Sequence, residues 1–412
     1  MEILPVERMD PVELETRHAR CRELMERLLP QARGLMVFSP LAIYYLSGTL
    51  GNGVLWLPQD APAVLLARRG IERARAESPL ERIVNFRSFS DIPQLLADAG
   101  APLPSPPEAV AAEMNGLSWS LATLLQGRLR RCEFIAGDMI LSRARAIKSS
   151  WELNKLRLAG ARHHDSLYHR LPERIAAGQT ERDISVSIWD IFFSQGHCGL
   201  MRMSGLGEEM FLGHVCAGES ANYPSRYNGP VGLRGVHPTV PFMGYAGSVW
   251  TERQLLTCDV GFCLEGYHTD KTQVYWSGRR DTLDAQLVAA HDFCIETQSW
   301  LAGQLKPGAI PSELYAACIE RAQRAGYGDG FMALDGNKVP FVGHGIGLTI
   351  DEWPVLAKGF DEPLHAGMTL ALEPKIGIRD RGMVGVENTF EVTTNGGRCL
   401  TGEAWDILCV DA

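Results

Sequence analysis

Short segments in which apolar and polar residues alternate occur in pairs in the second half of the chain, and a run of turn-forming residues separates each pair. This pattern is typical of antiparallel β-hairpins. The paired strands are residues 255–262 with 267–276, around a reversal at 264–266, and residues 370–373 with 385–392, around a turn at 379–382. The sequence therefore predicts two hairpins in this half of the chain.

Other segments carry apolar residues at helical spacing, and these predict amphipathic helices. The predicted helices cover residues 18–29, 180–196, 281–305 and 312–325, with a further one that starts after Ser149. Ser149 and Glu152 have the spacing of a capping box, which marks the start of a helix. In the first part of the chain, residues 34–38, 53–57 and 63–67 are strand-like. Strands interleaved with helices indicate a mixed α/β (α+β) fold.

A chain of 412 residues is too long for one ordinary hydrophobic core, so we expect two domains. The helix start at Ser149 places the boundary near residue 145. We therefore expect an N-terminal domain over residues 1–145, with a proline-rich loop at 102–107, and a second domain over residues 146–412.

Composition excludes several classes of partner. Hydrophobic residues make up 45% of the chain and charged residues 22%, as in globular proteins, and the net charge of −9 disfavours nucleic acid and anionic membranes as partners. No apolar run approaches the roughly 20 residues that cross a bilayer, and the acidic start of the chain does not resemble a signal peptide.

The ten cysteines show no paired spacing. We expect free thiols and a cytoplasmic location.

Four acidic residues in the predicted hairpins suggest a metal site. A two-residue loop at 264–265 would pair Cys263 with Gly266 and place Asp259 directly opposite Asp270, with Cβ atoms roughly 4.5–5.5 Å apart. Two carboxylates this close repel each other unless a cation lies between them. The turn at 379–382 is equally far from Glu373 and Glu387, so this second pair is also expected to face across its hairpin.

One histidine completes the set. His344 lies in the glycine-rich run 343–347, where the backbone can come close to a bound group. Four carboxylates carry a formal charge of −4, which two divalent ions would balance. Each of these residues alone would more often be an ordinary turn residue, so the prediction depends on the whole set. We expect two divalent metal ions.

The motifs that carry these residues resemble a known family. The segments CDVGFCLEGYHTDKT, GHGIGLTIDEWP, ALEPKIG and GVENTFEVT are similar in order and spacing to the metal-binding motifs of the pita-bread metallopeptidases, which include methionine aminopeptidase, aminopeptidase P and prolidase, with creatinase as a metal-free relative. The resemblance implies a ribonuclease H-like, creatinase-type N-terminal domain followed by a pita-bread catalytic domain. It also implies a tendency to form homodimers.

The resemblance assigns a role to each residue. Asp259 would bind one ion, Asp270 and Glu387 would bridge both ions, and His344 and Glu373 would complete the other site. Glu373 would also be the catalytic acid and base. Two such ions lower the pKa of a shared water toward neutrality and polarise the carbonyl under attack. Ligation by oxygens with a single nitrogen favours Mn²⁺ or Co²⁺, with Zn²⁺ and Fe²⁺ as alternatives.

The chain departs from the family around the substrate. A histidine expected seventeen residues before Asp259 is replaced by Phe242 in strict counting, or by Ser225 when the context is aligned. His237 and His214 are the nearest substitutes.

Two further positions differ. Asp351 stands where the family has a second histidine, and Gly385 where its proline-specific members have an arginine. An acid at position 351 would favour a cationic or amide-donor group over a carbonyl. Asp351, Thr272, Asn388 and His237 are our candidates for residues that hold the ligands or contact the substrate.

Three functions follow as alternatives. The first is a dinuclear Xaa-Pro dipeptidase or aminopeptidase acting on a small peptide. The second is a hydrolase of a small cyclic or N-substituted amide, as in creatinase and ectoine hydrolase. The third is a non-catalytic binding protein that uses the same fold. Residues 226–250 are rich in glycine and proline and lack periodicity, so they form either a surface loop or, as we prefer, a lid over the site.

Overall fold

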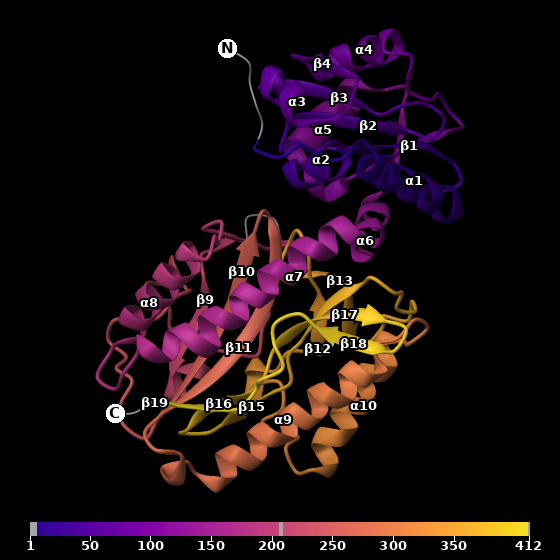
Figure 1. Ribbon diagram of the computed structural model, residues 1–412. Coiled ribbons are helices and arrows are strands. Elements are labelled where there is room, and N and C mark those ends of the chain that lie inside the picture. Colours follow the sequence, from indigo (N-terminus) through magenta and orange to yellow (C-terminus); the bar gives the residue numbers. More distant parts are fainter. Residues whose placement is uncertain (1–5, 206–208, 411–412) are drawn as a thin grey trace. The chain divides into compact units, whose positions relative to one another are not determined.

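The computed structural model describes residues 6–205 and 209–410. The chain divides into two compact units, Met1–Arg145 and Ala146–Ala412 (Figure 1). Both units combine helices with sheets, as the mixed pattern of the sequence predicts. Within the part of the chain that the structure describes, none of the helices has both the length and the apolar character needed to span a bilayer.

The N-terminal unit is built on one six-stranded sheet with the order β4-β3-β2-β1-β5-β6. Its strands are β1 (Ala32–Val37), β2 (Asn52–Pro58), β3 (Val64–Arg69), β4 (Ile83–Asn85), β5 (Ala109–Ala112) and β6 (Glu133–Ala136). Its helices are α1 (Pro11–Leu28), α2 (Pro40–Ser47), α3 (Ile71–Glu77), α4 (Ile92–Asp98), α5 (Trp119–Arg128) and α6 (Asp138–Ala146). Helix α1 begins earlier than predicted because the Asp10 carboxylate caps it by accepting a hydrogen bond from the Val12 N–H.

The second unit holds the two predicted hairpins in separate sheets. One sheet has the order β19-β11-β10-β9 and the other β13-β12-β14-β17-β18, while β15 and β16 form a two-stranded ladder. Their strands are β9 (Gly213–Ala217), β10 (Leu255–Leu264), β11 (Tyr267–Ser277), β12 (Phe341–Gly345), β13 (Glu352–Ala357), β14 (Thr369–Leu372), β15 (Lys375–Ile378), β16 (Gly382–Gly385), β17 (Asn388–Thr393), β18 (Gly396–Cys399) and β19 (Leu408–Val410). A small ladder joins β7 (Met201–Arg202) and β8 (Glu209–Met210).

Four long helices cover these sheets. Helices α7 (Ser150–His164) and α8 (Glu181–Ser194) pack against the sheet that contains β9, β10 and β11, and α9 (Ala285–Gln304) and α10 (Pro311–Arg324) pack against the other strands (Figure 1). The predicted capping box of α7 is present, with the Ser149 and Glu152 side chains each bonded to the other's backbone N–H. Helix α9 begins later than predicted because Asp284 caps it.

The register of the first hairpin corrects the predicted loop. The loop is Glu265–Gly266, so Leu264 pairs with Tyr267. Both loop residues have positive φ, 50° and 87°, which a two-residue hairpin of this type requires and which glycine at the second position favours. The shift places Asp259 opposite Thr272 instead of opposite Asp270. The two aspartates therefore lie on one face as diagonal neighbours.

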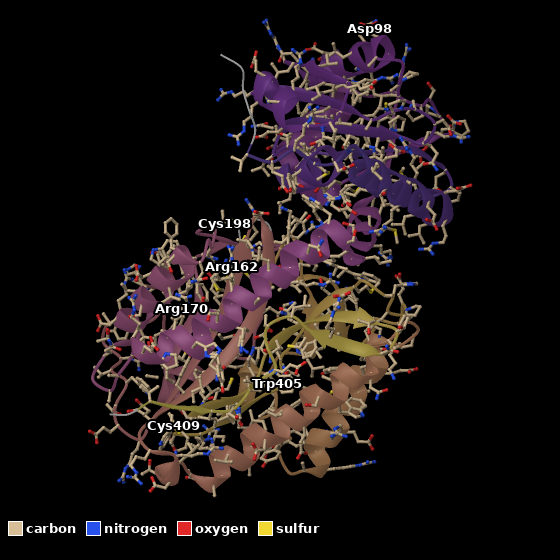
Figure 2. All side chains as sticks on the ribbon, in the orientation of Figure 1. Asp98, Arg162, Arg170, Cys198, Trp405 and Cys409 are labelled. Atoms are coloured by element: carbon tan, nitrogen blue, oxygen red, sulfur yellow. The ribbon has the colours of Figure 1, made fainter. Side chains whose placement is uncertain are left out.

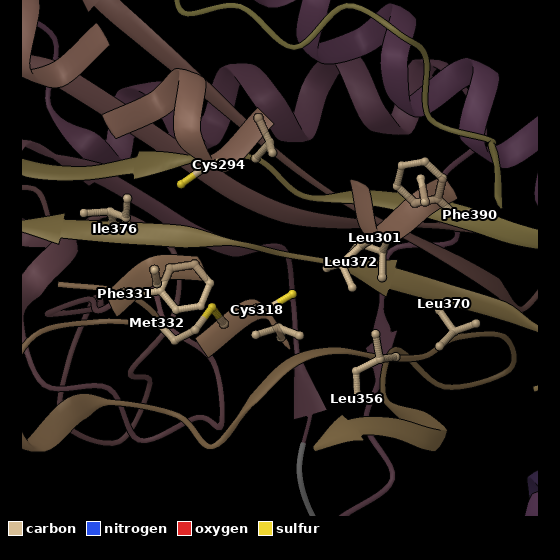
Figure 3. Packing of buried hydrophobic residues seen from close by; sticks show 14 of the residues in the cluster. Cys294, Leu301, Cys318, Phe331, Met332, Leu356, Leu370, Leu372, Ile376 and Phe390 are labelled. Atoms are coloured by element: carbon tan, nitrogen blue, oxygen red, sulfur yellow. The ribbon is translucent and has the colours of Figure 1, made fainter. Parts of the chain in front are cut away.

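The second hairpin has the predicted register. Leu372 pairs with Asn388 in one ladder and Lys375 with Gly385 in the next, so Glu373 and Glu387 face each other between the two ladders. This prediction is confirmed. Side chains alternate along these strands: Leu370, Leu372, Ile376 and Phe390 point into a hydrophobic cluster shared with Cys294 and Leu301 of α9 (Figure 3). The glutamates consequently point to the opposite face.

Residues 226–250 are packed over much of their length. Val231 and Leu233 are buried in a small cluster with Cys216 and Met383. Near the end of the segment, the Glu181 carboxylate accepts hydrogen bonds from the backbone N–H groups of Tyr245 and, outside the segment, Ala217, at 2.9 and 2.8 Å. The exposed runs of the segment are residues 236–239 and 245–247, with single exposed residues at 226, 228, 234 and 249.

All ten cysteines lie among the described residues, and none of them forms a disulfide bond. Figure 2 shows two of them, Cys198 and Cys409, far apart in the second unit. The absence of disulfides among the described residues agrees with the expectation of thiols.

Candidate metal centre

Five strands and turns bring the predicted acids and the histidine together. Asp259 lies in β10, Asp270 in β11 and His344 in β12, while Glu373 follows β14 and Glu387 precedes β17. Ligand atoms of Asp270, His344 and Glu387 all lie within 4.8 Å of one another. The two glutamates are buried, with 3% and 2% of their surface exposed. The structure thus gathers the set that the sequence singles out.

The imidazole of His344 faces the two glutamates. Its Nδ1 lies 3.0 Å from the carbonyl oxygen of Gly345, which can only accept a hydrogen bond, so Nδ1 carries the hydrogen in this contact. Nε2 lies 3.4 Å from Oε1 of Glu373 and 3.8 Å from Oε1 of Glu387. Nε2 is therefore the ring atom that could bind a metal ion beside these carboxylates.

Lys375, which none of the sequence motifs singles out as a site residue, lies on the other side of the glutamates. Its Nζ is 2.6 Å from Oε2 of Glu387, 3.2 Å from Oε2 of Glu373 and 3.6 Å from Oδ1 of Asp259. The side chain is completely buried. Each glutamate thus directs one oxygen toward His344 and the other toward Lys375. Strand alternation could have revealed this lysine, because a residue two positions after Glu373 projects to the same face.

Thr272 ties the two hairpins to each other. Its hydroxyl oxygen lies 2.7 Å from Oδ1 of Asp259 and 3.1 Å from Oε2 of Glu387. Its backbone N–H also donates to the carbonyl oxygen of Glu387 at 3.2 Å. Thr272 therefore fixes the position of one acid from each hairpin.

Asn388 supports the site from the opposite face of its strand. Its side-chain oxygen accepts hydrogen bonds from Lys271 Nζ at 2.8 Å and from the Thr401 hydroxyl at 3.0 Å, and its amide donates to Gln298 at 2.9 Å. All four residues are buried. Through these bonds Asn388 holds the strands that carry the acids in register. None of these bonds involves the side chain of an acid in the cluster.

The close packing of the acids raises the pKa values of two of them. Burial, followed by the nearby charge of Asp259, raises the pKa of Asp270 to about 7. Burial and then the charge of Asp270 raise the pKa of Glu387 well above its usual value. Because ionisation of Asp270 and Glu387 is unfavourable, these two residues bind either a proton or a metal ion.

Lys375 has the opposite effect on its neighbours. Burial is the largest single effect on Asp259 and opposes its ionisation, but the Lys375 ammonium, the hydrogen bond with Glu387 and the smaller effects of His214 and Thr272 together lower its pKa. Burial likewise acts to lower the pKa of Lys375, yet the surrounding carboxylates, Asp259 first, raise it well above that of a free lysine. Asp259 and Lys375 therefore form a buried ion pair.

Asp351 lies in the turn between β12 and β13 and is held by Ser204. The Ser204 N–H donates to one carboxylate oxygen at 2.7 Å and the Ser204 hydroxyl to the other at 2.8 Å. The negative charge of Asp351 acts to raise the pKa of His344, after the larger effects of burial, Glu373, Asp270 and Gly345. The sequence gives no signal for Ser204, which is 147 positions away from its partner.

The proposed substitutes for the missing histidine lie in different places. His237 is exposed, and its ring contacts the Thr239 hydroxyl at 2.8 Å, so the structure does not bring it to the acids. His214 is the strand partner of Asp259 and is buried, with Nδ1 2.9 Å from the Val231 carbonyl oxygen. Among the described residues, its Nε2 has no hydrogen-bond partner.

The residues at the expected position of that histidine have local contacts. Phe242 packs beside the buried residues Met201, Met210 and Tyr227. The Ser225 hydroxyl accepts a hydrogen bond from the Tyr227 N–H at 3.0 Å.

Two family profiles match the chain. One, described as metallopeptidase family M24, covers residues 154–394. The other, described as the creatinase/prolidase N-terminal domain, covers residues 17–147. The five clustered residues all lie within the first match.

Known proteins resemble the chain over nearly all of its length. An Xaa-Pro dipeptidase of Pyrococcus furiosus is 26% identical over 377 residues, which cover 91% of this chain and 94% of the relative. A probable dipeptidase, PepE, of Mycobacterium bovis is 27% identical over 370 residues, 88% of each chain. The crystal structure of dipeptidase PepE from Mycobacterium ulcerans has the same fold, with a TM-score of 0.77, 21% identity and coverage of 98% of this chain and 100% of the other.

Proposed function

The chain belongs to metallopeptidase family M24, and on that premise we propose that it hydrolyses dipeptides, Xaa-Pro dipeptides among them. The observation that carries this proposal is the meeting of Asp270, His344 and Glu387 within 4.8 Å in the part of the chain that matches the family. The names of the relatives from Pyrococcus furiosus and Mycobacterium bovis, an Xaa-Pro dipeptidase and a probable dipeptidase, support a dipeptide as the substrate.

The donor set fits a divalent metal ion. Asp270, Glu387 and Glu373 offer carboxylate oxygens, and His344 offers the single nitrogen. Such a set favours Mn²⁺ or Co²⁺, and Zn²⁺ and Fe²⁺ accept the same ligand types. The fit to a second ion on the Asp259 side is poorer, because oxygens there already contact Lys375.

The proposed reaction is the hydrolysis of an amide bond. The bound ion would supply a Lewis acid that polarises the carbonyl of the substrate and makes a water molecule more acidic. Glu373, buried beside His344 and Lys375, takes the proton of the attacking water at a carboxylate oxygen and delivers it to the nitrogen of the leaving amine. Thr272 keeps Glu387 and Asp259 in place during these steps.

Asp351 is our candidate for binding the substrate's amino group. Ser204 occupies both carboxylate oxygens from one side, which fixes the carboxylate and leaves its remaining lone pairs as acceptors. A fixed anion near the metal site attracts the α-ammonium group of a dipeptide. A peptide with a blocked amino terminus would lack this interaction.

A second candidate function is the hydrolysis of a small cyclic or N-substituted amide. The same Asp351 carboxylate would accept hydrogen bonds from the N–H groups of such a substrate, and glycine at position 385 removes the arginine that the family's proline-specific members use. Substrate assays separate the two functions. We also propose that the chain forms a homodimer, as the family resemblance implies, and light scattering would test this.

The experiment is an assay of the full-length protein after removal of metals and reloading with Mn²⁺ or Co²⁺. The panel contains Xaa-Pro dipeptides, dipeptides without proline, and small N-substituted amides. We expect cleavage of dipeptides that is lost in chelator and restored by the ion. Absence of turnover on every dipeptide in a sample shown to contain metal would overturn the proposal, and turnover of the small amides would then support the second candidate.

A further inference from the structure

The position of Lys375 changes the number of cations that the site can hold. Lys375 is the first residue of β15, and its strand partner is Gly385. Gly385 has a φ of +135°, and a Cβ atom at this position would lie 2.6 Å from Cα and 3.1 Å from Cγ of Lys375. Because Gly385 has no side chain, β15 can lie close to β16, and the side chain of Lys375 is buried among the acids.

The lysine ammonium donates hydrogen bonds to both glutamates and lies within ion-pair distance of Asp259. An ammonium group has three N–H donors and no acceptor. Its neighbours are three carboxylates, with oxygens of Glu387, Glu373 and Asp259 at 2.6, 3.2 and 3.6 Å from Nζ. The ammonium therefore lies at the point where these three carboxylates converge, which is the place that a bound cation would take.

The oxygens on the other side of the same glutamates are directed toward a second point. Oε1 of Glu373 and Oε1 of Glu387 lie 3.4 and 3.8 Å from Nε2 of His344. Ligand atoms of Asp270, His344 and Glu387 lie within 4.8 Å of one another. The cluster thus contains two cation positions that share two bridging glutamates. Lys375 fills one position, and the ligand atoms of Asp270, His344 and Glu387 surround the other.

Formal charge alone does not decide how many ions bind. The four carboxylates and the ammonium carry −3 together, so one divalent ion leaves −1 and two leave +1. The oxygen atoms decide, because a second ion would need those that already bind the ammonium. It would also lie next to a buried positive charge, where repulsion is much stronger than in water.

We propose that Lys375 takes the place of one metal ion and that the centre binds a single divalent ion, at Asp270, His344, Glu387 and Glu373. This inference rests on the proposed metal dependence but not on the identity of the substrate. The sequence predicts two ions because it shows the four acids but not their contact with Lys375. The inference replaces that prediction with a single ion.

Metal stoichiometry tests the inference directly on the full-length wild-type protein. The protein is stripped with a chelator, dialysed against Mn²⁺ and assayed for bound manganese by mass spectrometry, with electron paramagnetic resonance of the bound ion as a second measurement. We expect one ion per chain and the spectrum of an isolated Mn²⁺ centre. Two ions per chain with the spectrum of a coupled pair would overturn the inference.

A variant tests the role of the lysine itself. In Lys375→Met the three carboxylates lose their internal cation, so we expect bound manganese to rise from one ion to two per chain and the coupled signal to appear. Lys271→Met is the matched control: Lys271 is a buried lysine on the opposite face of β11, bonded to Asn388, and this change should leave one ion per chain. Circular dichroism verifies that both variants are folded. A folded Lys375→Met protein that still binds only one ion would contradict the inference.

The outcomes separate this inference from the proposed function. A wild-type protein that binds two ions and cleaves dipeptides would overturn the inference and leave the function standing. A wild-type protein that binds one ion and cleaves no dipeptide would support the inference and overturn the function. Absence of any bound ion would overturn both.

Discussion

Thr272 lies directly opposite Asp259 across the β10–β11 ladder, and its hydroxyl is 2.7 Å from Oδ1 of that aspartate. The same hydroxyl lies 3.1 Å from Oε2 of Glu387, in the second hairpin. Residues that form hydrogen bonds to metal ligands orient those ligands, and replacing such residues typically lowers metal affinity by about 10- to 100-fold. Substitution of Thr272 should therefore change the affinity for metal, although Thr272 is not itself a proposed metal ligand.

We expect Thr272→Val to weaken the binding of Mn²⁺ by about 10- to 100-fold, the usual effect of removing a group that orients a ligand. Valine keeps the shape of threonine but cannot donate to Asp259 or Glu387. Calorimetric titration of the chelator-treated protein measures the dissociation constant. Thr272→Ser keeps the hydroxyl and is expected to bind as the wild type does. Equal affinities of the valine variant and the wild type would refute the proposed role.

Glu373→Gln is expected to lower kcat by ~10²- to 10⁴-fold, the range typical for loss of a general acid or base. The amide cannot take the proton of the attacking water. Because the change removes one of several crowded buried acids, we expect the melting temperature in chelator to stay the same or rise. Steady-state assays with Mn²⁺ and thermal unfolding provide the two measurements.

The matched control for that variant is Glu391→Gln in β17. Glu391 is a buried acid paired with Arg157 and Arg398, outside the metal centre. Its neutralisation should lower the melting temperature and leave kcat near the wild-type value. If both glutamine variants lost activity to the same degree, a specific role of Glu373 in proton transfer would be excluded.

The raised pKa of Asp270 predicts how stability depends on pH when chelator is present. This pKa is about 7 in the folded protein, whereas the ordinary value for an aspartate is 3.8. Between these values the folded protein retains a proton that the unfolded chain has released, so this group makes the folded protein less stable as pH rises from about 4 to about 7.

The comparison of wild type with Asp270→Asn isolates this effect from that of other titrating groups. Asparagine has no charge to lose, so the variant's melting temperature in chelator should rise relative to that of the wild type as pH increases from 5 to 8. Saturating Mn²⁺ should abolish this trend in the wild type, because the ion replaces the proton. A constant difference across this pH range in chelator would disprove the explanation.

Asp351→Asn is expected to raise KM for dipeptides by about tenfold, which corresponds to a loss of roughly 1.4 kcal/mol in a charge-assisted hydrogen bond. The value of kcat should change little, because Asp351 does not take part in proton transfer. Dipeptides with an acetylated amino terminus should show no change in KM, since they lack the ammonium group.

Asp361→Asn serves as the control for this change. The Asp361 carboxylate accepts a hydrogen bond from the Ser312 hydroxyl at 2.5 Å on an exposed part of the second unit, so the pair matches Ser204 and Asp351 in chemistry. Its KM should equal that of the wild type. An unchanged KM in Asp351→Asn would remove this residue from the substrate site.

Sequence patterns predicted the strands and the set of acids, because alternation and turn residues are local signals. The family and the order of its two domains were also correctly predicted from four short motifs. The register of the first hairpin was wrong by one residue. Its turn requires positive φ at both Glu265 and Gly266, a requirement that the apolar Leu264 meets poorly.

The contacts of the site could not be predicted in the same way. Strand alternation predicts that Lys375 lies on the same face as Glu373. Its contact with Asp259 depends on how two hairpins from separate sheets pack together, and the sequence of neither hairpin specifies this packing. The partnership of Ser204 with Asp351 joins segments 147 positions apart, and no local pattern encodes it.

The close approach of Gly385 to Lys375 also bears on how this chain diverged from its relatives. A side chain at position 385 would require the two strands to move apart, and that movement would withdraw residue 375 from the acids. The two positions should therefore covary: lineages with a long basic side chain at 375 should retain glycine at 385, and lineages with a side chain at 385 should have lost the internal cation.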